Sequence, residues 1–322
     1  MHTPILSICI PTYNRAHYLK DCLESLRVQL AENSSLAHEV EVVIADNAST
    51  DSTGEVVNEY APHFEHFSYI KNPENVGFDR NVDISVRGAH GAYCWYLGDD
   101  DAIIQGALSH IVETARESTY AVISVTDRPI IERPITYSPE SYTTTDHIDG
   151  LSPSENYLAG YLPSALSMLI FRRDGWLAVA DIEEFTTGWF YFETILKIAA
   201  SENARVLHIK KPMILTGQDM RWADNGAGLK IFIDCNNFLY KMQEWGYDRE
   251  AIGCEIENNA RRFPIVLLQA KGKGLPITFK NFRIIRAFTK TTSFITRTLS
   301  SLLFFIPNPL VRLIRDFKKK LS

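Results

Sequence analysis

Short apolar runs alternate with amphipathic segments along the first third of the chain. Four apolar runs predict buried strands: PILSICI, VEVVIAD, FSYI and AYCWYLG. The segments between them predict helices, as shown by the spacing of Leu19, Leu23, Leu26 and Leu30 in the first segment. Strands that alternate with helices are typical of a doubly wound α/β sheet. The pattern therefore predicts a Rossmann-like α/β fold here.

Polar loops follow three of these strands, with the sequences PTYNR, DNAST and GDDD. In doubly wound sheets, ligands bind beyond the carboxyl ends of the strands. We therefore expect these three loops to form one site. The adjacent aspartates Asp99, Asp100 and Asp101 would repel one another there unless a cation offset their charge.

The pattern is less regular after residue 118. Residues 120–127 and 205–216 predict strands, whereas 188–202 predict a helix. A stretch rich in Pro, Thr and Ser, 128–156, predicts a loop. Two further helices are expected at 229–246 and 249–272.

The composition is that of an ordinary globular protein, with 45% hydrophobic and 22% charged residues among 322. The five cysteines have neither a disulfide pattern nor metal-ligand spacing, so we expect a reducing cytoplasm and no zinc site. We expect no signal peptide and no membrane span. The net charge of −6 is uneven, because residues 271–322 hold twelve Lys and Arg and one acid, a net charge of +11. Such a basic segment indicates an anionic partner.

Four segments in chain order resemble the donor half of the family 2 glycosyltransferases: ICIPTYNRAHYLKDCLESL, VEVVIADNASTDST, NPENVGFDRN and YCWYLGDDDAI. Within that family they are most similar to bacterial O-antigen transferases of the abequosyltransferase-like group. The resemblance implies the GT-A fold, with a doubly wound mixed sheet and a helical, amphipathic extension after it. It also implies transfer of a sugar from a nucleoside diphosphate donor.

The resemblance implies that the PTYNR loop holds the donor nucleotide. The side chains suit this role, because hydroxyl and amide groups offer hydrogen bonds, Tyr13 can stack on a base and Arg15 can pair with phosphate. The implied donor set is Pro11, Thr12, Tyr13, Asn14, Arg15, Asp46, Asn47, Arg80 and Asp99. Each of three members has a structural alternative: Asn14 as a helix N-cap, Asp46 in an Asx-turn and Arg80 in a surface salt bridge.

The aspartates are expected to bind Mg2+ or Mn2+. A divalent cation on the diphosphate stabilises the leaving group, and one or two carboxylates suffice to hold it. We predict Asp100 and Asp101 as the metal residues, with Asp100 as the direct ligand. The family pattern is Asp-x-Asp-Asp, and this chain has Gly98 in place of its first aspartate. The alternative is an acidic loop that caps a helix starting at Ala102.

An inverting transferase also needs a general base for the acceptor hydroxyl. The family supplies an acid in its second half, and Glu193 is the first candidate because aromatic residues at 189–192 would form a desolvated wall around it. The alternatives are a solvated Glu193 and three rival acids, Asp181, Glu183 and Glu184. Possible diphosphate contacts are Gln218 and Arg221 in LTGQDMRW.

Residues 281–322 predict two cationic amphipathic helices. Apolar side chains fall within a sector of about 60°, with basic ones opposite, and these apolar residues are Ile284, Phe288, Ile295, Leu299, Leu302 and Ile306. This pattern favours the surface of an anionic membrane. The alternative is a helix packed on the rest of the protein. A nucleic-acid partner is not expected, because a tail that binds nucleic acid would be more polar.

These observations predict four regions: donor-binding (1–117) and acceptor-binding (118–230) halves of a GT-A domain, a helical extension (231–280) and membrane-surface helices (281–322). The predicted function is metal-dependent, inverting transfer of a sugar to a lipid-linked (undecaprenyl diphosphate) oligosaccharide of an O-antigen or capsule, at the cytoplasmic face of the plasma membrane. A non-catalytic adaptor with a degenerate site and a nucleotidyltransferase are the alternatives.

Overall fold

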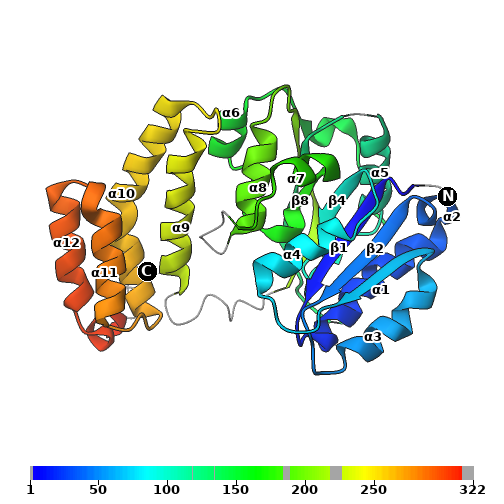
Figure 1. The fold of residues 1–322 in the computed structure, drawn as a ribbon, viewed down its shortest axis with the longest axis horizontal. Coiled ribbons are helices and arrows are strands. Elements are labelled where there is room, and N and C mark those ends of the chain that lie inside the picture. Colours follow the sequence, from blue (N-terminus) through cyan, green and yellow to red (C-terminus); the bar gives the residue numbers. More distant parts are fainter. Residues whose placement is uncertain (1–2, 118, 134, 184–188, 218–226, 314–322) are drawn as a thin grey trace. The chain divides into compact units, whose positions relative to one another are not determined.

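The computed structural model describes residues 3–117, 119–133, 135–183, 189–217 and 227–313 (Figure 1). The chain divides into two compact units, Met1–Gln218 and Asp219–Ser322. The first unit is an α/β domain, and the described part of the second is helical.

A mixed sheet organises the first unit, with the strand order β3-β2-β1-β4-β8-β6-β9-β5 and β7 paired to β9. The four strands β3, β2, β1 and β4 are parallel to one another, and β8 joins β4 antiparallel. The strands are β1 Leu6–Thr12, β2 Val40–Asp46, β3 His66–Lys71, β4 Tyr93–Tyr96, β5 Ala102–Ile103, β6 Val122–Pro129, β7 His147–Ile148, β8 Leu169–Arg172 and β9 Val206–Thr216.

Helices cover both faces of the parallel strands, which explains why β1, β2 and β4 are buried along their whole length. Leu6, Ile8 and Ile10 of β1 belong to the same buried cluster as the leucines of α1. Cys9 points to the other face, where its thiol lies 3.7 Å from the Ser85 carbonyl of α4. The helices of this unit are α1 Ala16–Glu32, α2 Ser34–Ala37, α3 Thr53–Tyr60, α4 Phe78–Arg87, α5 Ala107–Glu117, α6 Pro153–Leu158, α7 Arg173–Val179 and α8 Phe190–Ala199.

The strands and helices predicted for the first third are confirmed, and two local features differ. Strand β1 continues through Pro11, which is paired with Ala45 of β2, so the loop begins only after Thr12. The helix considered at Ala102 is absent among the described residues, because Ala102 and Ile103 form strand β5 against β9.

The second unit contains α9 Ala227–Met242, α10 Arg249–Gly272, α11 Phe279–Phe288 and α12 Phe294–Phe305. Phe263 of α10, Ile285 of α11 and Phe304 of α12 share one buried cluster. No helix in the described ranges is both long and apolar enough to cross a membrane.

The single apolar sector predicted across 284–306 is wrong, because the chain turns at 289–293 and starts a new helix. The Ser293 hydroxyl accepts the Thr296 N–H at 3.2 Å and caps α12, which resets the helical phase. Phe288 consequently packs against the core, whereas Ile295 and Leu302 are exposed.

Candidate active site

The loops after β1, β2 and β4 meet at one edge of the sheet, as the sequence predicts. Thr12 and Asp46 are paired at the ends of β1 and β2. The Asn47 N–H donates to the Thr12 carbonyl at 2.9 Å. From the loop after β4, Asp99 accepts a 2.8 Å hydrogen bond from the Thr12 hydroxyl. The three polar motifs therefore form one cluster.

Arg15 supplies the cation that the adjacent aspartates require. Its Nε lies 2.9 Å from Asp99, and its Nη2 lies 2.8 Å from Asp100. Burial raises the pKa of Asp99 to about 7, although the nearby Arg15 and the Thr12 hydroxyl act in the opposite direction. The pairing of Arg15 with phosphate stays a prediction, and a phosphate would compete with these two carboxylates for the guanidinium.

Asp101 is held by donors from two distant segments. The Ser167 hydroxyl donates to Oδ2 at 2.5 Å, and the Gly217 N–H donates to Oδ1 at 2.8 Å. Burial raises the pKa of Asp101 to about 6, against the effect of these donors. Each oxygen of Asp101 accepts one hydrogen bond that fixes the loop, and its role as a metal residue stays a prediction.

Ser167 is a site residue that the sequence analysis missed. Its hydroxyl also accepts the Gly98 N–H at 2.7 Å, so that one side chain ties the two ends of the aspartate loop together. Its carbonyl accepts the indole N–H of Trp95 at 2.8 Å. No local motif marks this serine, which lies 66 residues beyond Asp101 in the chain.

A side chain at position 98 would crowd Asp101. A Cβ atom at this position would lie 2.9 Å from Oδ2 of Asp101 and 3.3 Å from the Ser167 hydroxyl. The aspartate that the family pattern places here would therefore displace the contacts that hold Asp101.

Replacing Ser167 with alanine is expected to lower the free energy of unfolding by about 1–3 kcal/mol. The substitution leaves the Gly98 N–H and one Asp101 oxygen without their partner in a half-buried loop. Urea denaturation at pH 7 measures the change, with Ser138→Ala in an exposed loop as the matched control. Equal stabilities of the two variants would show that Ser167 does not hold the loop.

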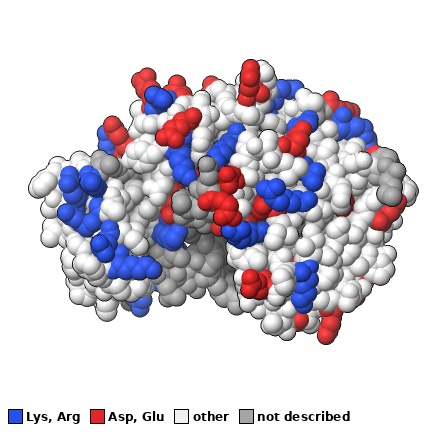
Figure 2. All heavy atoms as spheres, viewed as in Figure 1, with Lys and Arg blue, Asp and Glu red and all other residues white. Residues whose placement is uncertain are grey.

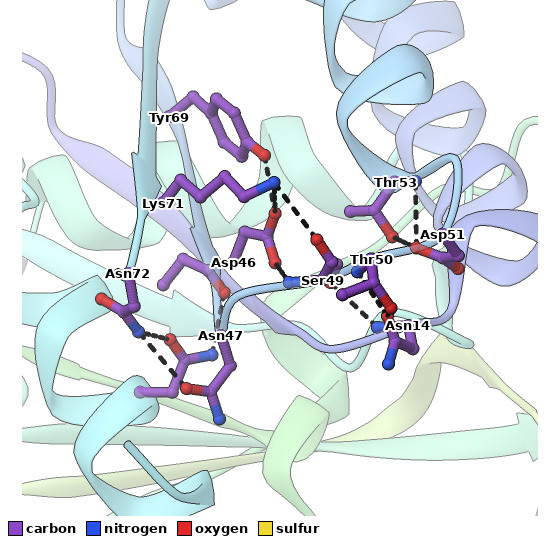
Figure 3. Close-up of polar contacts among 12 residues, drawn as sticks. Asn14, Asp46, Asn47, Ser49, Thr50, Asp51, Thr53, Tyr69, Lys71 and Asn72 are labelled. Carbon is purple, nitrogen blue, oxygen red and sulfur yellow. Dashed lines mark hydrogen bonds and ion pairs between the residues drawn. The ribbon is translucent and has the colours of Figure 1, made fainter. Parts of the chain in front are cut away.

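Asp46 is buried and engaged within the protein (Figure 3). Its carboxylate accepts the Tyr69 hydroxyl and the Ser49 N–H, each at 2.7 Å. The ammonium of Lys71 lies 3.9 Å from the Asp46 carboxylate. The predicted contact between Asp46 and the nucleotide stays a prediction, and it would require a donor in place of Tyr69.

The loops after β1 and β2 are joined through Asn14, which lies in the left-handed region with φ 53°. Its carboxamide oxygen accepts the Thr50 N–H at 2.8 Å, as Figure 3 shows. Asn14 is not the N-cap of α1, because Arg15 occupies that position without a side-chain bond. Instead, Asp51 accepts the Ala16 N–H at 3.1 Å, which anchors α1 to the second loop.

The remaining donor candidates lie in different surroundings. Tyr13 is 44% exposed and is free to stack on a flat ring. Asn47 is buried, and its carboxamide accepts the Val76 N–H at 2.8 Å. Arg80 forms a surface ion pair of 2.7 Å with Glu183, the alternative that the sequence analysis offered.

The aspartate loop suits a metal ion that is coordinated jointly by the protein and a bound ligand better than one coordinated by protein side chains alone. Within the described residues, no group of three acid, histidine or cysteine side chains is arranged to hold a metal. The Asp100 side chain is 19% exposed, and carboxylate oxygen is the ligand that Mg2+ and Mn2+ prefer. These cations usually take few protein ligands and complete their shell with phosphate oxygens and water.

Glu193 lies in the buried first part of α8. It is 5% exposed, so the alternative of a solvated helix acid is wrong. Lys197 lies 3.6 Å from its carboxylate. The ring of Tyr191 lies 6.2 Å from that of Tyr96, which ends β4, so α8 begins close to the strand that leads into the aspartate loop.

Among the rival acids, Asp181 accepts the Glu183 N–H at 3.0 Å and Glu183 is the partner of Arg80. Glu184, Gln218 and Arg221 lie outside the described residues.

Comparisons with known proteins agree with this architecture. Residues 7–165 match the family model for glycosyl transferase family 2. The chain is 28% identical to the abequosyltransferase RfbV of Salmonella typhimurium over 80% of this chain and 86% of that protein. This relative is an abequosyltransferase, which is the group that the sequence motifs resemble.

Two solved structures share the fold at low sequence identity. Staphylococcus aureus TarS 1–349 in complex with UDP gives a TM-score of 0.61 at 15% identity, over 98% of this chain and 91% of that one. The mannosyltransferase PcManGT from Pyrobaculum calidifontis, in complex with GDP-Man and Mn2+, gives 0.58 at 16% identity, over 97% and 88%. The chain is therefore a glycosyltransferase built on the GT-A fold, and its residues 7–165 form a domain of glycosyl transferase family 2.

Proposed function

We propose that this glycosyltransferase moves a sugar from a nucleoside diphosphate donor to a hydroxyl of a lipid-linked bacterial surface glycan, with inversion at the sugar carbon. The observation that carries the donor class is the cluster of Thr12, Arg15, Asp99 and Asp100 at the carboxyl ends of the parallel strands. The UDP and GDP-Man complexes of the two structural neighbours support it.

Asp100 is proposed to hold Mg2+ or Mn2+. Bound there, the cation would neutralise charge that develops on the departing nucleoside diphosphate. Asp101 orients the loop through Ser167 and Gly217. Arg15 would pair with a donor phosphate, and the exposed ring of Tyr13 would stack on the base.

Glu193 is proposed as the general base for the acceptor hydroxyl. Its burial limits the access of water to the carboxylate, and Lys197 provides a neighbouring cation. The acceptor is proposed to be a polyprenyl diphosphate-linked oligosaccharide of an O-antigen or capsule, at the cytoplasmic face of the membrane. The match to an abequosyltransferase supports a deoxyhexose or hexose donor.

The donor class is tested by thermal shift with UDP-, GDP-, CDP- and dTDP-sugars, each with Mn2+ and with EDTA. We expect one nucleotide to raise the Tm, because a ligand that binds only the folded state stabilises it. The increase should vanish with EDTA and in Asp100→Asn. Stabilisation that is equal with EDTA would remove the cation from the proposal, and no stabilisation by any nucleotide would overturn the donor class.

A further inference from the structure

Helix α12 turns its most apolar side to solvent. Phe294, Ile295 and Leu302 are 77%, 75% and 66% exposed. The side that packs into the second unit includes two hydroxyl residues, Thr296 and Ser300. A helix that served only to complete a core would bury its apolar side. The exposed apolar side of α12 therefore indicates that another apolar environment covers it.

Specific contacts hold α12 in this orientation. Lys271 is fully buried, and its ammonium donates to the Phe304 carbonyl at 2.6 Å, near the end of α12. The Ser293 cap fixes the first turn. Just beyond the helix, the Asn308 amide donates to the Leu275 carbonyl at 2.8 Å. Rotating α12 to bury its apolar side would break these bonds.

The neighbouring helix α11 carries cations on its exposed side. Arg283, Arg286 and Lys290 are spaced three and four residues apart and are exposed, so they lie along one side of this region. Figure 2 shows Lys and Arg side chains gathered over the end of the second unit that holds α11 and α12. No Asp or Glu occurs between residues 274 and 313. Ile285 and Phe304 pack into the same core, so both exposed sides point away from it.

We propose that these two exposed sides form one docking surface for an anionic lipid bilayer. This surface, the α11–α12 face, consists of Arg283, Arg286 and Lys290 with Ile295, Leu299 and Leu302. The cations would meet lipid phosphates, and the aliphatic side chains would enter the boundary between headgroups and acyl chains. A second copy of the chain fits less well, because pairing two such faces would bring like charges together. The proposal does not depend on the donor site.

The test is sedimentation of the full chain with two kinds of vesicle. One is phosphatidylcholine alone, and the other contains about one third phosphatidylglycerol, an anionic lipid. We expect binding to the anionic vesicles only, weakening as salt rises. The triple variants Ile295→Gln/Leu299→Gln/Leu302→Gln and Arg283→Gln/Arg286→Gln/Lys290→Gln should each bind about a hundredfold more weakly.

Matched controls separate this face from general surface effects. Ile131→Gln/Leu158→Gln/Leu177→Gln removes three exposed apolar residues from the first unit, and Arg249→Gln/Arg261→Gln/Arg262→Gln removes three exposed cations from α10. Both should bind vesicles as the unaltered chain does. All substituted residues are exposed, and thermal melts verify that each variant folds.

Three results would overturn the proposal. The first is absence of binding by the unaltered chain to anionic vesicles. The second is an equal loss of binding in the test and control triples. The third is a dimer, detected by light scattering, that is lost in Ile295→Gln/Leu299→Gln/Leu302→Gln while vesicle binding is unchanged. A second copy of the chain would then be what binds this face. Retained donor-induced thermal shifts in every variant would show that the donor site is separate.

Discussion

Asp100→Asn is expected to lower kcat/KM by about 10²–10³. Asparagine keeps the size of the side chain but removes the negative charge that is proposed to hold the cation, and loss of one such electrostatic contact typically costs this much. The variant should fold normally, because the Asp100 side chain is only partly buried and the asparagine oxygen can still accept a hydrogen bond from Arg15. Release of nucleoside diphosphate at a fixed, subsaturating Mn2+ concentration measures turnover.

Two comparisons make the Asp100 result specific. Asp174→Asn removes an exposed carboxylate that pairs with Arg172, and it should leave turnover unchanged. The loss in Asp100→Asn should shrink as Mn2+ is increased if weaker metal binding causes it. Full activity of Asp100→Asn at limiting Mn2+ would assign the cation to another group.

Glu193→Gln is expected to lower kcat by about 10²–10⁴ while KM for the donor stays nearly constant. A general base acts on the acceptor hydroxyl in the transition state, so its loss reduces turnover more than donor binding. Gln keeps the volume of this buried side chain, although it loses the ion pair with Lys197. Steady-state kinetics with a polyprenyl diphosphate-linked acceptor separates kcat from KM.

Two control variants separate the proposed role of Glu193 as a base from the structural effect of changing a buried side chain. Lys197→Met removes the same ion pair without changing the proposed base, so a drop in kcat equal to that of Glu193→Gln would assign the effect to loss of this ion pair. Glu202→Gln alters an exposed acid just beyond α8 and should have no effect. Donor hydrolysis without acceptor should persist in Glu193→Gln if the donor site is intact.

The first third of the fold was predictable because its strands and helices have strong local patterns. The leucines of α1 recur at helical spacing and pack on alternate residues of β1. The co-location of Thr12, Asp46 and Asp99 was also predictable, because the carboxyl ends of parallel strands meet at one edge.

The contacts that position the aspartates were not predictable from local pattern. Ser167 and Gly217 reach Asp101 from 66 and 116 residues away. Ser167 lies in no recognisable motif, and the segment LTGQDMRW, which contains Gly217, was singled out only for Gln218 and Arg221. Charge complementarity alone did not say whether a metal or Arg15 would accompany the aspartates. The break at 289–293 was missed because periodicity was extended through a stretch of threonines, where a serine cap starts a new helix.

The tight fit at Gly98 matters for engineering. Consensus design replaces a residue with the one most common among relatives, and such changes often add stability. The family pattern has aspartate at position 98, where its Cβ would lie 2.9 Å from an oxygen of Asp101. A fourth carboxylate would also join three that already repel one another. A change at position 98 therefore forces the Asp101 side chain to shift, so positions 98, 101 and 167 are best designed together.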